Sequence, residues 1–228
     1  MWLEISYQPT SLFSLKLSSS TSSAGKSLPC PSPYSVKMAL LNAIITYDSM
    51  ETAKDYFDLI RDLKLFFLLP GSFVVNNCMV RILKDNDKVS KTLKAIEPFK
   101  STVAFREYVY LDGEIKIAVN VANISDKEVE FLKKWFVNIN YFGKRGCFFQ
   151  FSGIKKKERL SNNYVTVLDK SFPPGIMFPM DDVDEKAEFK NMNNFDCRTR
   201  AKRNENIYVF PYKQIEANKT YTFFKNII

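Results

Sequence analysis

Residues 29–43 read Pro-Cys-Pro-Ser-Pro-Tyr-Ser-Val-Lys-Met-Ala-Leu-Leu-Asn-Ala, and this stretch contains a strong helix start. Ser32 can accept hydrogen bonds from the free N–H groups of the first turn, and Pro33 has the fixed φ that suits the first helical position. Apolar side chains then recur at spacings of four, three and four residues, at Tyr34, Met38, Leu41 and Ile45. This spacing predicts an amphipathic helix that ends near Tyr47 and packs on a core.

Strands and further helices are expected on both sides of this helix. In chain order, the sequence predicts strands at Trp2–Tyr7 and Leu12–Leu17, the helix above, a helix from Ser49 to about Leu65, strands at Phe73–Lys84, Val103–Leu111 and Glu114–Val121, a helix after the capping box Ser125–Glu128, and a strand at Cys147–Phe151. The Asp112-Gly113 pair favours a tight turn, so the strands on either side of it are expected to form a hairpin. With insertions set aside, the order predicts an α+β fold: a ferredoxin-like (RRM-like) antiparallel sheet with helices on one face.

Composition changes along the chain suggest two parts. Residues 1–155 would form the ferredoxin-like domain, with a lysine-rich insertion at about residues 84–102. Residues 156–228 would form a β-rich C-terminal extension that packs on the first domain, with strands at Tyr164–Leu168, Ile207–Phe210 and Thr220–Phe224.

The composition excludes several classes of enzyme. The chain has 228 residues, a net charge of +8 and no histidine. The absence of histidine removes Ser-His-Asp and Cys-His catalysis and histidine-ligated metal sites. The few glycines form no phosphate-binding motif, so we expect no nucleotide cofactor and no metal. The excess of positive charge instead suggests an anionic partner.

The cysteines and the N-terminus indicate the cell compartment. The four cysteines (Cys30, Cys78, Cys147 and Cys197) lie far apart and match no zinc or redox spacing, so reduced thiols are expected. Apolar and polar residues alternate near the N-terminus, which is typical of a strand and not of a signal peptide. The most apolar windows are too short to cross a bilayer. We therefore expect a cytoplasmic protein with no membrane partner.

Two clusters of basic residues account for the excess of positive charge in residues 141–228. The clusters are Lys144, Arg145, Lys155, Lys156, Lys157 and Arg159, and then Arg198, Arg200, Lys202 and Arg203. Aromatic residues stand between the cations around residues 141–151, and such interleaving favours single-stranded nucleic acid, because rings stack on bases while cations neutralise phosphates. Gly143 and Gly146 bracket two of the cations in a loop whose backbone can approach a phosphate closely.

A third candidate anion site lies at the first turn of the helix that begins at Pro33. Ser32, Tyr34 and Lys37 stand there, where free N–H groups and the helix dipole favour an anion, and Lys26 in the preceding loop could reach the same group.

Each feature has a plainer alternative. A run of charge can be a solvated surface. Phe149, Phe151 and Tyr34 can be core residues. The acidic stretch Asp181, Asp182, Asp184 and Glu185 can bind a cation, form an exposed loop or pair with the basic clusters.

The N-terminal strand, the proline-bearing loop and residues 29–43 together resemble CRISPR-associated protein family five, the RAMP-superfamily subunit of type I interference (Cascade) complexes. The loop and aromatic strand at Phe142–Phe151 resemble the glycine-rich loop of that superfamily. The resemblance covers residues 1–152 well and the rest of the chain loosely.

This resemblance implies a non-catalytic subunit that binds the 5′ handle of the crRNA, with a projecting thumb at Lys84–Thr102. Its implied partners are the crRNA, the backbone and large subunits of the complex and, through the complex, target DNA. The basic clusters, the helix start and this resemblance together give the candidate RNA-binding residues Lys26, Ser32, Tyr34, Lys37, Arg81, Lys88, Lys91, Lys144, Arg145, Arg198, Arg200, Lys202 and Arg203.

One branch of the family processes crRNA with Tyr, Lys and His. The alternative function is therefore a metal-independent endoribonuclease in which Tyr34 and Lys37 remain, although this chain has no histidine.

Overall fold

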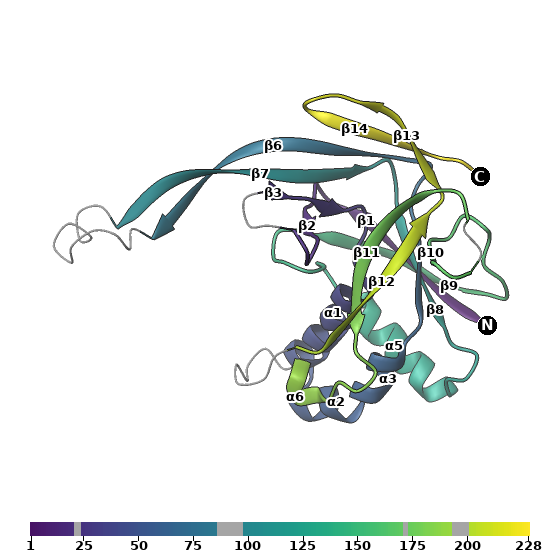
Figure 1. Cartoon of the computed structure of the whole chain (residues 1–228). Helices are drawn as coiled ribbons and strands as arrows, with labels where there is room; N and C mark the ends of the chain where they lie inside the picture. The colour runs from purple at the N-terminus through teal and green to yellow at the C-terminus, as the bar shows by residue number, and fades with distance from the viewer. Residues whose placement is uncertain (21–23, 86–97, 171–172, 193–200) are drawn as a thin grey trace.

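The computed structural model describes residues 1–20, 24–85, 98–170, 173–192 and 201–228. Its helices are α1 (Pro33–Tyr47), α2 (Met50–Asp55), α3 (Phe57–Asp62), α5 (Asp126–Val137) and α6 (Phe189–Met192). Three sheets and a two-stranded ladder accompany them (Figure 1). The predicted α+β class with antiparallel sheets is confirmed.

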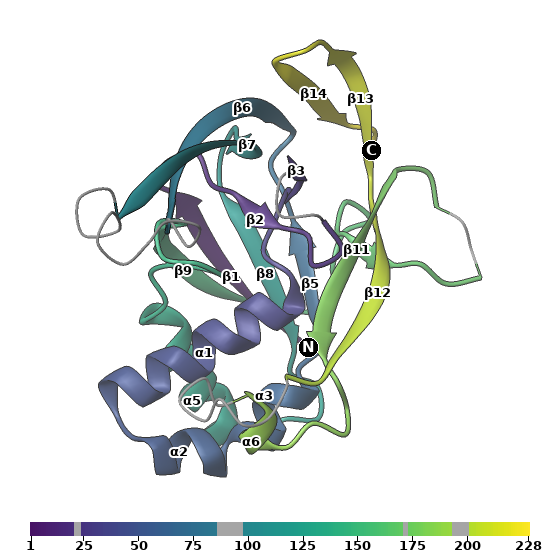
Figure 2. The same ribbon diagram turned by 60° about the vertical axis from the view of Figure 1, so that its left-hand side comes forward.

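The central sheet has four antiparallel strands. In spatial order they are β5 (Leu65–Leu68), β8 (Ile115–Asn120), β1 (Trp2–Pro9) and β9 (Phe149–Lys157). Helices α1 to α3 lie between β1 and β5 in the chain, and α5 lies between β8 and β9. All these helices lie on one side of the sheet (Figure 2). The antiparallel sheet with helices on one side agrees with the predicted α+β class, and its ferredoxin-like detail stays a prediction.

A second sheet carries a long hairpin away from the body. Its strands, in spatial order, are β13 (Tyr212–Ala217), β14 (Tyr221–Asn226), β6 (Ser72–Asp85), β7 (Phe99–Leu111) and β3 (Ala24–Gly25). Strands β6 and β7 are paired from Phe73 opposite Leu111 to Asp85 opposite Phe99. Their far ends project beyond the rest of the molecule (Figure 1).

The remaining strands form a third sheet and a short ladder. A third sheet has the order β10 (Thr166–Val167), β12 (Arg203–Phe210) and β11 (Ile176–Val183), and the short ladder pairs β2 (Leu15–Lys16) with β4 (Ser27–Leu28). Strand β11 packs on α1, and β14 extends the hairpin sheet by pairing with β6. The division at residue 155 stays a prediction.

Helices α1 and α5 begin where the local sequence predicts. Ser32 caps α1 by accepting a hydrogen bond from the Ser35 N–H at 3.2 Å, and Pro33 occupies the first turn. Ser125 and Glu128 form the reciprocal capping box of α5. These predictions are confirmed because a cap is decided by residues three positions apart.

Two predicted elements are wrong. The predicted second helix is broken at Tyr56 and ends at Asp62, and Leu65–Leu68 forms strand β5. The strands on either side of Asp112-Gly113 do not pair with each other: β7 pairs with β6, and β8 pairs with β1 and β5. Tertiary pairing decides both outcomes, because a strand joins the partner that buries its apolar face.

The core lies between the central sheet and the helices. Leu3, Ile5 and Tyr7 point from β1 toward this side and are fully buried. The Tyr7 hydroxyl donates a hydrogen bond to the carbonyl of Phe136 in α5 at 2.6 Å, and burial raises the Tyr7 pKa well above its ordinary value. Phe149 is buried and Phe151 packs against the core, so the core alternative for these rings is confirmed.

The outer face of β1, opposite the helices, carries a buried carboxylate. Glu4 is 2% exposed, and its side chain lies 2.7 Å from the Lys157 ammonium and 3.9 Å from that of Lys116. The Tyr164 hydroxyl also donates a hydrogen bond to it. Burial alone would raise the Glu4 pKa, but hydrogen bonds from Lys157 and Tyr164 and the nearby positive charges together lower it.

Cys30, Cys78 and Cys147 are free thiols, and Cys197 lies outside the described residues. Among the residues that the structure describes, no helix is long and apolar enough to span a membrane.

The lowered pKa of Glu4 predicts a pH-dependent contribution to stability. Because the folded state holds this proton less tightly than the unfolded chain, the stabilisation is complete above about pH 4.5, the ordinary value, and is lost as the pH falls through the folded pKa. Glu4→Gln should lower the free energy of unfolding at neutral pH by roughly 1–3 kcal/mol, with a smaller difference in acid. Urea titrations across this range measure both effects.

The control for this measurement is Glu130→Gln. Glu130 is exposed on α5 and forms a surface ion pair with Lys133, so its replacement should have little effect. Equal pH dependence in the two variants would show that the Glu4 carboxylate does not stabilise the fold.

Candidate nucleic-acid interface

The glycine loop is fixed beside the first turn of α1. Gly143 and Gly146 have φ values of +71° and +100°, a region that favours glycine. A Cβ at Gly143 would lie 2.8 Å from the Leu15 Cδ2 atom of β2. The loop therefore closes tightly on β2 and leaves Lys144 and Arg145 exposed at its tip.

A hollow of about 270 Å³ lies between this loop, the first turn of α1 and the C-terminal sheet. Its lining includes Lys16, Tyr34, Lys144, Asp181 and Arg203. The guanidinium carbon of Arg203 lies 3.9 Å from the centre of the Tyr34 ring, in a cation–π contact. The same guanidinium lies 3.2 Å from the Asp181 carboxylate, which also accepts a hydrogen bond from Ser18.

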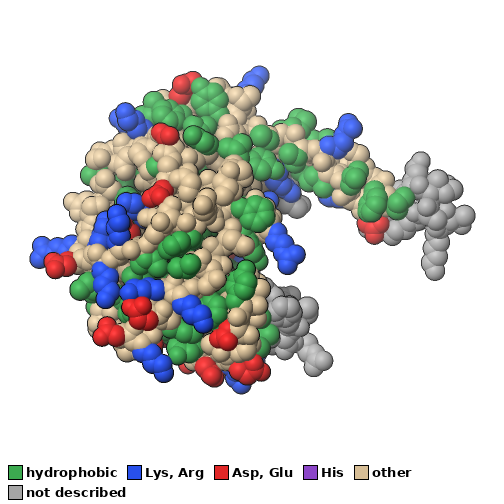
Figure 3. All heavy atoms as spheres, turned by 180° about the vertical axis from the view of Figure 1, so that it is seen from behind, with side chains coloured by type: hydrophobic (Ala, Val, Ile, Leu, Met, Phe, Trp, Pro, Cys, Tyr) green, Lys and Arg blue, Asp and Glu red, His purple; other side chains and the backbone are tan. Residues whose placement is uncertain are grey.

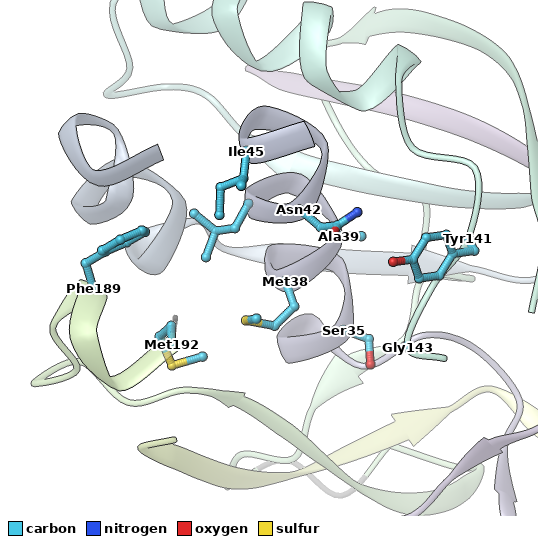
Figure 4. Close-up of a pocket in the computed structure, with 10 residues that line it drawn as sticks. Ser35, Met38, Ala39, Asn42, Ile45, Tyr141, Gly143, Phe189 and Met192 are labelled. Carbon is cyan, nitrogen blue, oxygen red and sulfur yellow. The ribbon is translucent and has the colours of Figure 1, made fainter. Parts of the chain in front are cut away.

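Two further hollows continue along the exposed side of α1. The first shares Ser35 and Gly143 with the hollow above and lies between Tyr141 on one side and Phe189 on the other (Figure 4). The second shares Ala39, Asn42 and Tyr141 with the first and reaches Arg145. We call the three together the α1 groove.

The α1 groove is positively charged and partly aromatic. Its lining contains four cations (Lys16, Lys144, Arg145 and Arg203) and one carboxylate, Asp181. Its lining also includes the small side chains of Ser35 and Ala39 and the rings of Tyr34 and Tyr141. Cations that neutralise phosphates beside rings that stack on bases are the arrangement that single-stranded nucleic acid requires.

No family model matches the sequence. A curated relative, CRISPR-associated protein Cas5 from Archaeoglobus fulgidus, is 24% identical over 224 residues, which cover 95% of this chain and 92% of the relative. The chain is similar to Cas5. The resemblance predicted from residues 29–43 and the glycine loop is thereby confirmed.

Two solved structures are also similar in fold. A CRISPR protein from Archaeoglobus fulgidus has a TM-score of 0.48 and 10% identity, covering 99% of this chain and 91% of that one. A chain of a CRISPR RNA-guided surveillance complex has a TM-score of 0.49 and 14% identity, covering 91% of this chain and 88% of that one.

The structure brings together some of the residues that the sequence predicted to bind RNA. Tyr34, Lys144, Arg145 and Arg203 line the α1 groove, and Ser32 lines it only as the buried helix cap. Lys26 and Lys202 are exposed but line none of the three hollows of the α1 groove, and Arg81 is exposed on the hairpin. Lys88, Lys91, Arg198 and Arg200 lie outside the described residues, as does most of the predicted thumb.

Lys37 does not face the groove, and its predicted contact with an anion at the helix start is wrong. Its side chain is 2% exposed, and its ammonium lies 2.7 Å from the Asp182 carboxylate and donates to the Arg61 carbonyl at 2.6 Å. Burial lowers the Lys37 pKa and raises that of Asp182, in each case by more than the partner's charge restores. A spacing of three residues places Lys37 close to the Tyr34 face of α1. Its side chain is nevertheless buried, because β11 packs on α1 and supplies the Asp182 carboxylate.

The acidic stretch is a partner for basic residues within the chain. Asp182 pairs with Lys37, and Asp181 pairs with Arg203. No cluster of metal-ligating side chains occurs among the residues that the structure describes. Of the alternatives for this stretch, pairing with a basic cluster is confirmed for Asp181, which contacts Arg203.

Sequence reasoning missed Lys16 and the part of the acidic stretch that enters the groove. Lys16 reaches the groove because β2 pairs with β4, eleven residues later in the chain. The alternation around residues 12–17 signals a strand, but the sequence does not show which elements it meets.

The tight approach of Gly143 to Leu15 predicts that Gly143→Ala destabilises the loop. An alanine at this position would keep the strained positive φ, and its Cβ would lie too close to the Leu15 side chain. We therefore expect a decrease of roughly 1–3 kcal/mol in the free energy of unfolding. Gly153→Ala is the matched control, because no atom lies within 4 Å of its Cβ position. Equal unfolding midpoints in urea for the two variants would contradict this account of the loop.

The buried Lys37–Asp182 pair predicts that a substitution of Lys37 lowers stability and leaves RNA binding unchanged. Lys37→Ala leaves a buried carboxylate unpaired and should cost about 3–5 kcal/mol, whereas Lys37→Met with Asp182→Leu should cost less. Lys54→Ala, an exposed lysine in α2, serves as control. A Lys37→Ala protein of normal stability but weakened RNA binding would return Lys37 to the interface.

Proposed function

We propose that the chain is a non-catalytic RNA-binding subunit of a type I CRISPR interference (Cascade) complex, and that it holds the 5′ handle of the crRNA in the α1 groove. The backbone and large subunits of the complex would be its neighbours, and target DNA would be met through the assembled complex. The observation that carries this proposal is the convergence of Tyr34, Lys144, Arg145 and Arg203, from three separate segments, on one groove.

The charge of the α1 groove supports a polyanionic ligand. Lys16, Lys144 and Arg145 have no ion-pair partner among the described residues, whereas Arg203 pairs with Asp181. Three unpaired cations along one groove would attract a phosphate backbone and release its counterions.

The Tyr34–Arg203 contact supports a single-stranded ligand. Tyr34 is half-buried and presents its ring to the guanidinium at 3.9 Å, so a planar group already occupies that face of the ring. An unpaired base can stack on a guanidinium plane as it does on an aromatic ring, so the free face of the Arg203 guanidinium would extend this stack.

The similarity to Cas5, which extends over nearly the whole of both chains, supports the assignment to a CRISPR system. A guide RNA is then the single-stranded polyanion that such a system supplies to the α1 groove. The hairpin of β6 and β7, with Arg81 exposed on it, would serve as the base of the thumb.

The burial of Lys37 supports the non-catalytic form of the proposal. The endoribonuclease alternative uses Tyr34 and Lys37 as its remaining catalytic pair. The Lys37 ammonium is held by Asp182 and by the Arg61 carbonyl, and it would have to leave both partners to reach a ribose hydroxyl.

Removal of the two loop cations should weaken RNA binding without unfolding the protein. Lys144→Ala with Arg145→Ala should raise the Kd for handle RNA and reduce the slope of log K against log salt by about 0.7 for each phosphate that is no longer neutralised. The control pair is Lys54→Ala with Lys127→Ala, which removes the same charge from exposed helix positions outside the groove. Fluorescence anisotropy at several salt concentrations gives both quantities, and equal Kd values for the two pairs would remove the loop from the site.

The catalytic alternative is tested by incubating the purified protein with repeat RNA in EDTA. The proposal expects intact RNA. A discrete cleavage product that disappears in Tyr34→Phe would establish the endoribonuclease function instead.

A further inference from the structure

The outer face of the central sheet carries a second group of cations. Side chains alternate along a strand, so the contact of Lys157 with Glu4 places Lys155 on the same face and Lys156 on the opposite one. Lys116 of β8 is on this face too, because its ammonium also approaches Glu4. Basic side chains gather on the part of the body remote from the hairpin (Figure 3).

These lysines exceed what the fold needs. One buried carboxylate, Glu4, faces two ammonium groups, and one of these at 2.7 Å already neutralises it. Lys155 is exposed and has no ion-pair or hydrogen-bonding partner for its side chain among the described residues. Lys116, Lys155 and Lys157 therefore share one carboxylate, and an anionic ligand would offset the excess positive charge of this face.

Aromatic rings lie beside the lysines. Trp2 is directly opposite Lys157 in the sheet, so both side chains leave the same face. The Phe66 ring of β5 contacts Trp2 edge-on, with ring centres 5.2 Å apart, and both residues are partly exposed. Gly153 of β9, which lies next to Lys155 on this face, has open space in place of a side chain.

From these observations we propose that the outer face of the central sheet, defined by Trp2, Lys116, Lys155 and Lys157, is a second binding site for the phosphate backbone and bases of a single-stranded nucleic acid. The lysines would contact phosphates, and the Trp2 ring would stack on a base. Glu4 would hold Lys157 and Lys116 in place from beneath.

This site is separate from the α1 groove. The helices cover the inner face of the sheet (Figure 2). The α1 groove is lined by residues of α1 and of the glycine loop and by none of Trp2, Lys116, Lys155 and Lys157. One strand therefore cannot use both sites without passing around an edge of the sheet. The inference stands independently of the handle-binding function proposed above.

The test compares two neighbouring lysines that differ in the face they occupy. Lys155→Gln and Lys156→Gln remove the same charge from adjacent, exposed positions of β9 and leave the Glu4 contacts intact. Both substitutions are made in a protein that already carries Lys144→Ala and Arg145→Ala. Binding in the α1 groove is weakened in this background, so the remaining change in affinity reports on the outer-face site. The probes are oligouridylate, oligothymidylate and a duplex DNA.

We expect Lys155→Gln to weaken single-strand binding severalfold and to lower the salt slope by about 0.7, while Lys156→Gln leaves both unchanged. Oligouridylate and oligothymidylate distinguish RNA from DNA as the source of the strand. Equal effects of the two substitutions, no effect of either, or tighter binding of the duplex than of either single strand would overturn the proposal.

A second measurement reports stacking directly. The chain has two tryptophans, and Trp135 is buried with no hydrogen-bonding partner for its indole nitrogen, so Trp135→Phe removes an unsatisfied donor and leaves Trp2 as the sole indole fluorophore. Single-stranded probes should quench Trp2 emission in this protein, and Lys155→Gln should shift the quenching to higher probe concentration. Binding without quenching would exclude Trp2 from the site.

Discussion

Strand β1 is the constraint on which the rest of the structure depends. It is hydrogen-bonded to β8 on one side and to β9 on the other, so its residues cannot rotate from one face to the other. Leu3, Ile5 and Tyr7 anchor the helices through the inner face, and Glu4 organises lysines on the outer face. The α1 groove and the outer-face site thus lie on opposite sides of a single strand, and a shift of one residue in its register would destroy both.

Local signals can be predicted from the sequence, and long-range pairings cannot. The start of α1 at Ser32 and Pro33 and the capping box at Ser125 depend on contacts within one helical turn, and both predictions are confirmed. The strand at Leu65–Leu68 escapes prediction, because four apolar residues after a helix have no period long enough to separate strand from helix. Its identity is decided by β8, about fifty residues later.

The candidate site shows the same division. The glycine loop and its two cations are visible as a motif, since Gly143 and Gly146 bracket them. Lys37 and Arg203 look like equal members of the basic set in the sequence, but Lys37 is sequestered by Asp182 and Arg203 is shared between Asp181 and Tyr34. A count of basic residues thus overstates the charge that a ligand meets, because carboxylates distant in sequence cancel part of it.

The spacing of the central strands in the chain has a consequence for synthesis of the protein. Residue 149, the first of β9, leaves the ribosome 140 residues after residue 9, the last of β1. At about 5–20 residues per second, β1 waits roughly 7–30 s for this neighbour. Both of its edges are unpaired until β8 (Ile115–Asn120) has been made, and one edge is unpaired after that. During that interval the nascent chain exposes an apolar strand edge, which makes it a substrate for chaperones and a liability at high expression rates.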